Sequence, residues 1–295
     1  MPLDAQGLVL AVARTDRFID YPKILSNSEN RLLEGLEALY SKYNKRKFVH
    51  PDPLEFLYLF RDPKEREVAG LISASLAYGR VSQILKSISI CLEKMEMRPR
   101  AFLLSRSQTD IEKIFSDFNY RFTKAREMTR FLMGLKGLIE RYDTLEESFL
   151  KAGEEHENLP CLVVKRLSAF VSALLEMACL EKSYLLPDPR KKSACKRLFL
   201  FLRWMVRRDD VDPGGWTCLS PRDLLVPLDT HMFNIARDLG LTRRKQANLI
   251  TAIEITEAFK SLNPEDPVKY DFVLTRFGIR RELSRKDIPH LLSRS

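Results

Sequence analysis

Apolar residues recur at intervals of three and four along most of the chain, which is the spacing of one face of an α-helix. From Glu65 to Met95 this spacing continues on both sides of Gly79 and predicts two helices that meet at a tight turn over residues 77–80. Further helices are predicted around residues 27–39, 107–115, 124–141, 160–181, 193–206, 221–226, 229–239, 246–262 and 267–277. The alternation typical of β-strands is nearly absent, so we predict an all-α protein without an internal repeat.

Two charged residues lie at the starts of predicted helices in the middle of the chain. Ser193 suits the N-cap position of the helix that carries Lys196 near its start. Asp229 or Thr230 caps a later helix, and Gly240 suits the position that follows its last turn. A primary amine and a carboxylate are therefore each expected at the beginning of a helix.

Basic residues exceed acidic ones, with 49 Lys and Arg against 40 Asp and Glu and a formal net charge of +9. Such an excess favours a polyanionic partner, with nucleic acid first and an anionic membrane surface second. The excess is concentrated in one stretch that holds eight cations and no carboxylate. These cations are Arg190, Lys191, Lys192, Lys196, Arg197, Arg203, Arg207 and Arg208.

Other features exclude several classes of protein. Hydrophobic residues make up 45% and charged residues 30% of the chain, as in a soluble globular protein. We expect no signal peptide, since the N-terminal apolar patch lacks a basic leader, and no membrane span, since no apolar run approaches ~20 residues. Five cysteines without a CxxC pair predict reduced thiols and a cytoplasmic location. With no glycine-rich phosphate loop and four dispersed histidines, we expect neither a cofactor nor a metal.

Lys196 and Asp229 each allow two interpretations. A lysine that is partly desolvated among other cations has a lowered pKa, and its neutral amine can form a Schiff base. The plainer interpretation makes Lys196 one solvated cation of a phosphate-binding face. Asp229 is first an N-cap, worth about 1 kcal/mol, but a carboxylate held ionised there can also stabilise a cationic transition state. For His231 we favour a structural role.

A resemblance to a known family favours the chemical interpretation. Residues 227–233 read P-L-D-T-H-M-F, which resembles the V-D-T-H signature of the helix-hairpin-helix DNA glycosylase superfamily, the group that contains endonuclease III and the 8-oxoguanine glycosylases. In that family the aspartate is catalytic, and Asp229 is the matching residue. The family's lysine normally follows a hairpin of the type L-P-G-x-G-x-K, whereas residues 186–192 of this chain read L-P-D-P-R-K-K.

The altered hairpin is similar to that of the archaeal 8-oxoguanine glycosylase branch, in which the lysine and the aspartate lie farther apart. Lys196 precedes Asp229 by 33 residues, which suits that branch. Lys192 is the reserve candidate, because residues 192–194 resemble the K-T-A that follows the ordinary hairpin. Most of residues 30–280 also resembles a bacterial family of conserved hypothetical proteins, through the blocks S-A-C-K-R, P-L-D-T-H and D-P-V-K-Y-D, and this likeness implies no activity.

A weaker resemblance lies upstream. Residues 71–75 resemble the superfamily's L-L-S-A-Q, in which the glutamine fills the gap left by an extruded base. Ser75 stands at that position and is too short to do the same. Tyr78 or Arg80, at the turn between the two helices, is the alternative wedge between base pairs. Core packing for Tyr78 and solvation for Arg80 are the plainer interpretations.

The resemblance implies two helical subdomains that flank a basic cleft. We expect residues 1–64 to pack with the C-terminal subdomain, residues 65–190 to form a helical bundle, and residues 191–295 to carry Lys196 and Asp229. The residues assigned to DNA contact are Arg197, Arg203, Arg207, Arg208 and Lys192. The residues assigned to the base pocket are Trp204, Trp216, Phe199 and Phe201, of which the two phenylalanines can equally be core. No iron–sulfur cluster is expected, because every cysteine precedes Asp229.

The implied activity is removal of a damaged base, preferably an oxidised purine such as 8-oxoguanine, from double-stranded DNA by a monomeric, nucleoid-associated protein. The Lys196 amine would attack the sugar C1′ while Asp229 stabilises the positive charge, and the resulting Schiff base would permit AP-lyase cleavage of the strand. Two alternatives stay open. One is a helical protein that binds nucleic acid without catalysis, and the other is an enzyme on a small anionic substrate held by the arginines. No membrane partner is expected.

Overall fold

The computed structural model describes residues 26–151, 159–191, 193–280 and 282–288, and over these ranges the prediction of an all-α protein is confirmed. The helices are α2 (Asn27–Tyr43), α3 (Pro63–Leu76), α4 (Val81–Lys94), α5 (Pro99–Ser105), α6 (Gln108–Ile114), α7 (Ala125–Tyr142), α8 (Leu145–Lys151), α9 (Leu162–Met177), α10 (Lys196–Val206), α11 (Thr230–Asp238), α12 (Leu249–Leu262) and α13 (Asp271–Ile279). Short 3₁₀ segments are η1 (Arg46–Phe48), η2 (Pro53–Leu59), η3 (Pro189–Lys191), η4 (Pro221–Asp223) and η5 (Arg285–Asp287). One antiparallel hairpin, of β1 (Asn119–Tyr120) and β2 (Thr123–Lys124), interrupts them.

The helix ends follow local side-chain chemistry, with one difference from the expectation. The predicted turn between α3 and α4 contains Gly79 with φ +104°, a conformation that L side chains rarely adopt. Ser193 is not the N-cap of α10, because Cys195 takes that position in a left-handed conformation and the helix begins at Lys196. The Ser193 hydroxyl instead accepts a hydrogen bond from the Cys195 N–H at 3.4 Å.

Three elements were not predicted from the sequence. The helices α5 and α8 have seven residues each, too few for an apolar repeat to be recognised. The strands β1 and β2 have two residues each, so no alternation can develop in them. These elements matter because the hairpin lies against the turn that contains Gly79, where an added Cβ would meet Arg121 of the hairpin.

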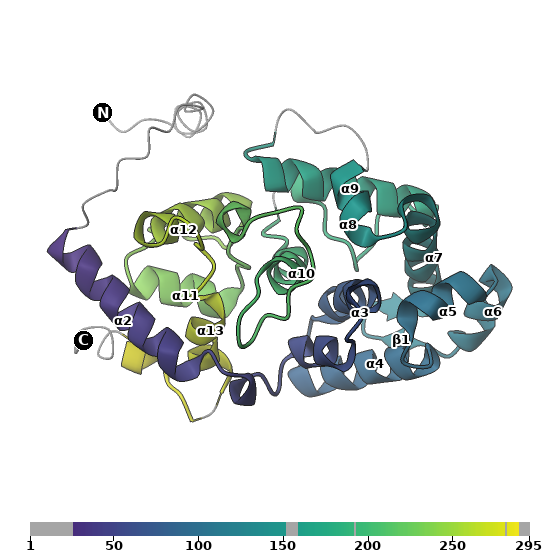
Figure 1. Cartoon of the computed structure of the whole chain (residues 1–295), viewed down its shortest axis with the longest axis horizontal. Helices are drawn as coiled ribbons and strands as arrows, with labels where there is room; N and C mark the ends of the chain where they lie inside the picture. The colour runs from purple at the N-terminus through teal and green to yellow at the C-terminus, as the bar shows by residue number, and fades with distance from the viewer. Residues whose placement is uncertain (1–25, 152–158, 192, 281, 289–295) are drawn as a thin grey trace.

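The helices form two groups on either side of α10 (Figure 1). In the first group α2 contacts α12 and α13, and α11 packs on α13. In the second group α3 contacts α4, α5 and α8, and α7 packs on α9. The helix α10 packs on α3 of the second group. Figure 1 shows α10 between the two groups. The predicted domain boundaries at residues 64 and 190 remain predictions.

The helix α10 is anchored by its apolar side chains. Leu198, Phe199, Phe201, Leu202 and Trp204 are all at most 1% exposed. The loop that follows turns back over the end of the helix, where Gly214 and Trp216 donate N–H groups to carbonyl oxygens of the last turns. Such burial fixes the axis of α10, and therefore the place of Lys196 at its first turn. Within the described ranges, no helix is both long and apolar enough to cross a membrane.

Candidate catalytic site

Lys196 and Asp229 lie together in the folded chain. The Lys196 Nζ is 3.3 Å from Asp229 Oδ2, and the side chains are 34% and 18% exposed. Lys196 is the first residue of α10, and Asp229 is the N-cap of α11. The second carboxylate oxygen, Oδ1, accepts a hydrogen bond from the Met232 N–H at 2.9 Å. One oxygen therefore caps a helix while the other faces an amine that solvent, and hence a ligand, can reach.

The segment that leads into Asp229 is buried and is hydrogen-bonded to α12. The segment that leads into Asp229 contains Val226 and Leu228, which are 0% and 2% exposed. The Val226 N–H donates a hydrogen bond to Thr256 Oγ1 on α12 at 3.0 Å. The pair is thus set between two rigid helix starts, an arrangement suited to chemistry that needs fixed geometry.

A second carboxylate, that of Asp271 at the start of α13, interacts electrostatically with both Asp229 and Lys196. Its Oδ2 pairs with Arg203, and its buried Oδ1 has no hydrogen-bond partner among the described residues. Burial, with a smaller contribution from the negative charge of Asp229, raises the pKa of Asp271 to about 6 against the opposing effect of Arg203 and Lys196. The sequence offered Asp271 only as part of the D-P-V-K-Y-D block, with no role attached.

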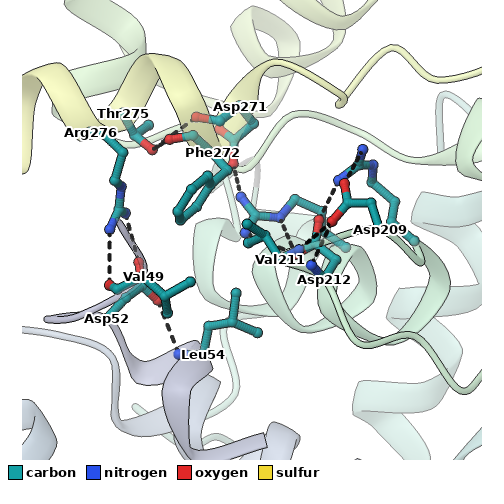
Figure 2. Close-up of polar contacts among 12 residues, drawn as sticks. Val49, Asp52, Leu54, Asp209, Val211, Asp212, Asp271, Phe272, Thr275 and Arg276 are labelled. Carbon is teal, nitrogen blue, oxygen red and sulfur yellow. Dashed lines mark hydrogen bonds and ion pairs between the residues drawn. The ribbon is translucent and has the colours of Figure 1, made fainter. Parts of the chain in front are cut away.

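Arg203 of α10 and Arg207, the C-cap residue of that helix, form a buried network of ion pairs that includes Asp271. Arg203 pairs with Asp212 at 3.1 Å and with Asp271, and Arg207 also pairs with Asp212. Arg207 further pairs with Asp209 and Asp266, each at 2.9 Å. Figure 2 labels the carboxylates of Asp209, Asp212 and Asp271, and its dashed lines mark their polar contacts.

The network corrects an expectation from the sequence. Arg203 and Arg207 are 2% and 3% exposed, and their guanidinium groups are occupied by carboxylates. They cannot reach the phosphates of DNA, so the prediction of DNA contact is wrong for these two residues. The signal available in the sequence was their four-residue spacing within an otherwise apolar helix, which placed them on faces that pack.

The other predicted DNA contacts have different surroundings. Arg197 is partly buried, and its guanidinium donates to the carbonyl oxygens of Ser75 and Tyr184. Burial lowers its pKa. Arg208 and Arg80 are exposed, and Lys192 lies outside the described residues. The basic stretch therefore divides into buried structural arginines and a smaller exposed set.

The predicted base pocket is also corrected. Phe199, Phe201 and Trp204 are at most 1% exposed and Trp216 is 5% exposed, so none of the four presents a face to a ligand. The Trp216 indole N–H donates to a carboxylate oxygen of Glu67 at 2.8 Å, and its ring packs edge-on against Phe201. These side chains form core because they lie on the faces of α10 and its following loop that pack against α3.

The proposed wedge position is partly occupied by other contacts. Tyr78 is half-buried, and its hydroxyl lies 2.7 Å from Thr123 Oγ1 and 3.1 Å from the Tyr120 carbonyl oxygen. Ser75 is fully buried. The exposed aromatic rings in this region are Phe122 and Tyr184, at 61% and 47% exposure. The sequence analysis assigned no role to either residue. Phe122 lies in the two-residue connection between β1 and β2, where a side chain is exposed.

A surface hollow of about 660 Å³ lies beside Arg197, lined also by Tyr184, Arg190 and Lys191. Lys196 and Asp229 are not part of its lining. Over the described ranges, no group of three or more His, Cys, Asp or Glu side chains is arranged to hold a metal ion. The reactive groups that the described site brings together are the Lys196 amine and the Asp229 carboxylate.

Comparison with known proteins gives one match. A family model with the description "Protein of unknown function (DUF2400)" matches residues 52–280, a range that includes Lys196, Asp229 and Asp271. No curated protein and no solved structure matches the chain.

Proposed function

The chain belongs to the DUF2400 family, and from its site we propose that it is a DNA glycosylase with AP-lyase activity, similar to the helix-hairpin-helix superfamily. The observation that carries the proposal is the 3.3 Å approach of the Lys196 amine to Asp229 Oδ2 at a helix N-cap. The P-L-D-T-H-M-F resemblance supports it, because Asp229 matches that family's catalytic aspartate. The preferred substrate is an oxidised purine such as 8-oxoguanine in double-stranded DNA, by likeness to the archaeal branch.

Binding of DNA would depend on exposed cations, which exclude the buried Arg203 and Arg207. Arg80, Lys191 and Arg208 are exposed and can contact phosphates, which makes the affinity dependent on salt. The damaged nucleotide would be rotated out of the duplex at a cost of a few kcal/mol. In this proposal the two groups of helices flank the DNA, and the protein acts as a monomer at the nucleoid.

The Lys196–Asp229 geometry supplies the first chemical step. In the first step the Lys196 ammonium gives a proton to Asp229 Oδ2, which lies 3.3 Å away, and becomes the nucleophilic amine. The amine nitrogen then forms a bond to C1′ of the sugar, while the bond from C1′ to the base breaks and its electron pair leaves with the base. The proton held on Asp229 passes to the departing base, and the regenerated carboxylate stabilises the positive charge at C1′.

A Schiff base accounts for the second activity. Opening of the sugar ring gives an imine between the Lys196 nitrogen and C1′, with the ring oxygen taking a proton. Loss of a proton from C2′ then breaks the C3′–O bond and releases the 3′ phosphate, which is β-elimination of the strand. Water hydrolyses the imine and restores the amine.

Borohydride trapping tests the proposal. Duplex DNA that carries one lesion from a panel is incubated with the protein and borohydride, and the products are scored for base release, nicking and a covalent adduct. We expect an adduct with the wild-type protein and none with Lys196→Ala. The control variant is Lys113→Ala, which removes an exposed lysine of α6 that has no part in the proposed DNA contacts and should leave the adduct intact.

The outcomes distinguish the alternatives. An undiminished adduct in Lys196→Ala would exclude this lysine as the nucleophile. Salt-dependent binding to duplex without base release on any lesion would instead favour a non-catalytic nucleic-acid-binding protein. Absence of both binding and release would favour the small anionic substrate.

A further inference from the structure

Four aromatic rings from three separate segments meet at one place on the surface, and we call them the aromatic patch: Tyr78, Tyr120, Phe122 and Tyr184. The centroid of Tyr184 lies 4.8 Å from that of Tyr78 and 5.0 Å from that of Phe122, and Tyr78 lies 4.9 Å from Tyr120. Tyr78 belongs to the turn after α3, Tyr120 and Phe122 to the β1–β2 hairpin, and Tyr184 to the segment after α9.

The patch has a fixed base and an exposed top. The Tyr78 hydroxyl lies 2.7 Å from Thr123 Oγ1, and the Tyr184 N–H donates to Glu127 Oε1 at 2.9 Å. Arg197 places its guanidinium carbon 5.1 Å from the ring centroids of both Tyr78 and Tyr184. Above this base, Phe122 is 61% exposed and Tyr184 is 47% exposed. Two adjacent rings that are exposed to water in this way are typical of a surface that a partner covers.

The surroundings of the patch are cationic. Arg121 lies next to the Phe122 ring, with its guanidinium carbon 5.6 Å from the centroid, and it is itself exposed. Arg80 and Lys124 are exposed on the same turn and hairpin. The hollow beside Tyr184 adds Lys182, Arg190, Lys191 and Arg197 against the acidic Glu181 and Asp188.

We propose that the aromatic patch binds unpaired nucleotides of DNA, with Phe122 and Tyr184 stacking on bases and Arg80, Arg121 and Lys124 contacting phosphates. Exposed rings set among cations are the combination by which proteins hold single strands, since every base has a face that can stack and every nucleotide carries a phosphate. The inference rests on the proposed function in taking DNA as the polymer. It adds a second contact region, outside the Lys196–Asp229 pair, for the strand that is separated when a nucleotide leaves the duplex.

The test measures binding of the full chain to a labelled oligothymidylate by fluorescence anisotropy at several salt concentrations. Stacking contributes about 1–3 kcal/mol per base, so Phe122→Ala should raise Kd by about 5- to 150-fold, and Phe122→Trp should retain the wild-type Kd. The slope of log K against log salt should not change, because no cation is removed. Arg121→Gln should instead reduce that slope by about 0.7.

The control is Leu59→Ala, which removes another exposed apolar side chain, 59% exposed, from η2. A Kd for Phe122→Ala within twofold of the Leu59→Ala value would overturn the inference, and so would wild-type protein that binds no oligothymidylate. Adduct formation on lesion duplex together with an unaffected Phe122→Ala would overturn the inference alone. Loss of binding in Phe122→Ala without any adduct in the wild type would support the inference and remove the proposed catalysis.

Discussion

Replacement of Asp229 separates its structural role from its chemical one. The Oδ1 atom accepts the Met232 N–H at 2.9 Å and caps α11, while Oδ2 faces Lys196 Nζ at 3.3 Å. Asp229→Asn keeps an oxygen that can accept the N–H and removes the negative charge. Asp229→Ala removes both. The two variants should therefore differ in stability and agree in activity.

The magnitudes follow from the contacts. Loss of an N-cap acceptor costs about 0.5–2 kcal/mol, and this applies to Asp229→Ala but not to Asp229→Asn. The ion pair with Lys196 is screened by solvent, since the lysine side chain is 34% exposed, so its loss costs at most about 1 kcal/mol in either variant. Asp229→Ala should lose about 1–2 kcal/mol of unfolding free energy, and Asp229→Asn less than about 1 kcal/mol.

The assay combines urea unfolding with single-turnover base release on lesion duplex. Both variants should release base at least about 100-fold more slowly than the wild type, because each lacks the group that takes the Lys196 proton and stabilises charge at C1′. If Asp229→Asn released the base at the same rate as the wild-type protein, the proposed role of the negative charge would be refuted. Equal losses of stability in the two variants would refute the assignment of the cap.

Three further predictions concern the fold around the site. Burial raises the pKa of Glu67 to about 7 from an ordinary 4.5. The folded state therefore binds this proton more tightly than the unfolded state does. The unfolding free energy should be about 3 kcal/mol higher below pH 4.5 than above pH 7, and the difference is lost as the pH rises through 7. Urea unfolding of Glu67→Gln should show less loss of stability over that interval, and an unchanged pH dependence would assign the effect to other groups. Arg203→Met leaves the buried Asp271 without its cation and leaves Asp212 paired with Arg207 alone, and it should lower the unfolding free energy by about 3–5 kcal/mol; a loss below about 1 kcal/mol in the same urea assay would show that the pairs are dispensable. Gly134→Ala should destabilise by about 1–3 kcal/mol, because its Cβ would lie 2.8 Å from the Leu174 carbonyl oxygen. Gly137→Ala should destabilise less, because its Cβ would lie 3.0 Å from Met177 Cβ and would need a smaller shift; equal Tm values for these two variants would contradict this packing.

The sequence predicts the helices of this protein well where apolar spacing is long, as for α3, α4, α7 and α12. It also predicts that Asp229 or Thr230 caps α11, because an N-cap depends on residues that are neighbours in the chain, and the structure has Asp229 at that position. It does not predict the β1–β2 hairpin, whose strands are too short to carry a pattern. Phe122, at the exposed turn of that hairpin, was missed for the same reason.

The ion pairs around the site could not be predicted from the sequence, because they form only in the folded chain. Arg203 and Arg207 stand in a stretch without acids. Asp209 and Asp212 follow that stretch directly and were not recognised as partners, and Asp266 and Asp271 come from a later segment that only folding brings near. Local sequence therefore made buried arginines look like a DNA-binding surface. The approach of Lys196 to Asp229 was expected from family resemblance, since a separation of 33 residues does not by itself imply contact.

The central claim is that Lys196 is the nucleophile, and peptide mapping of the borohydride-trapped adduct tests it most directly. The wild-type protein is trapped on lesion duplex and digested, and mass spectrometry locates the lysine that carries the reduced sugar remnant. The account predicts the remnant on Lys196, at the first turn of α10. A remnant on Lys192, or on any other lysine, would contradict it.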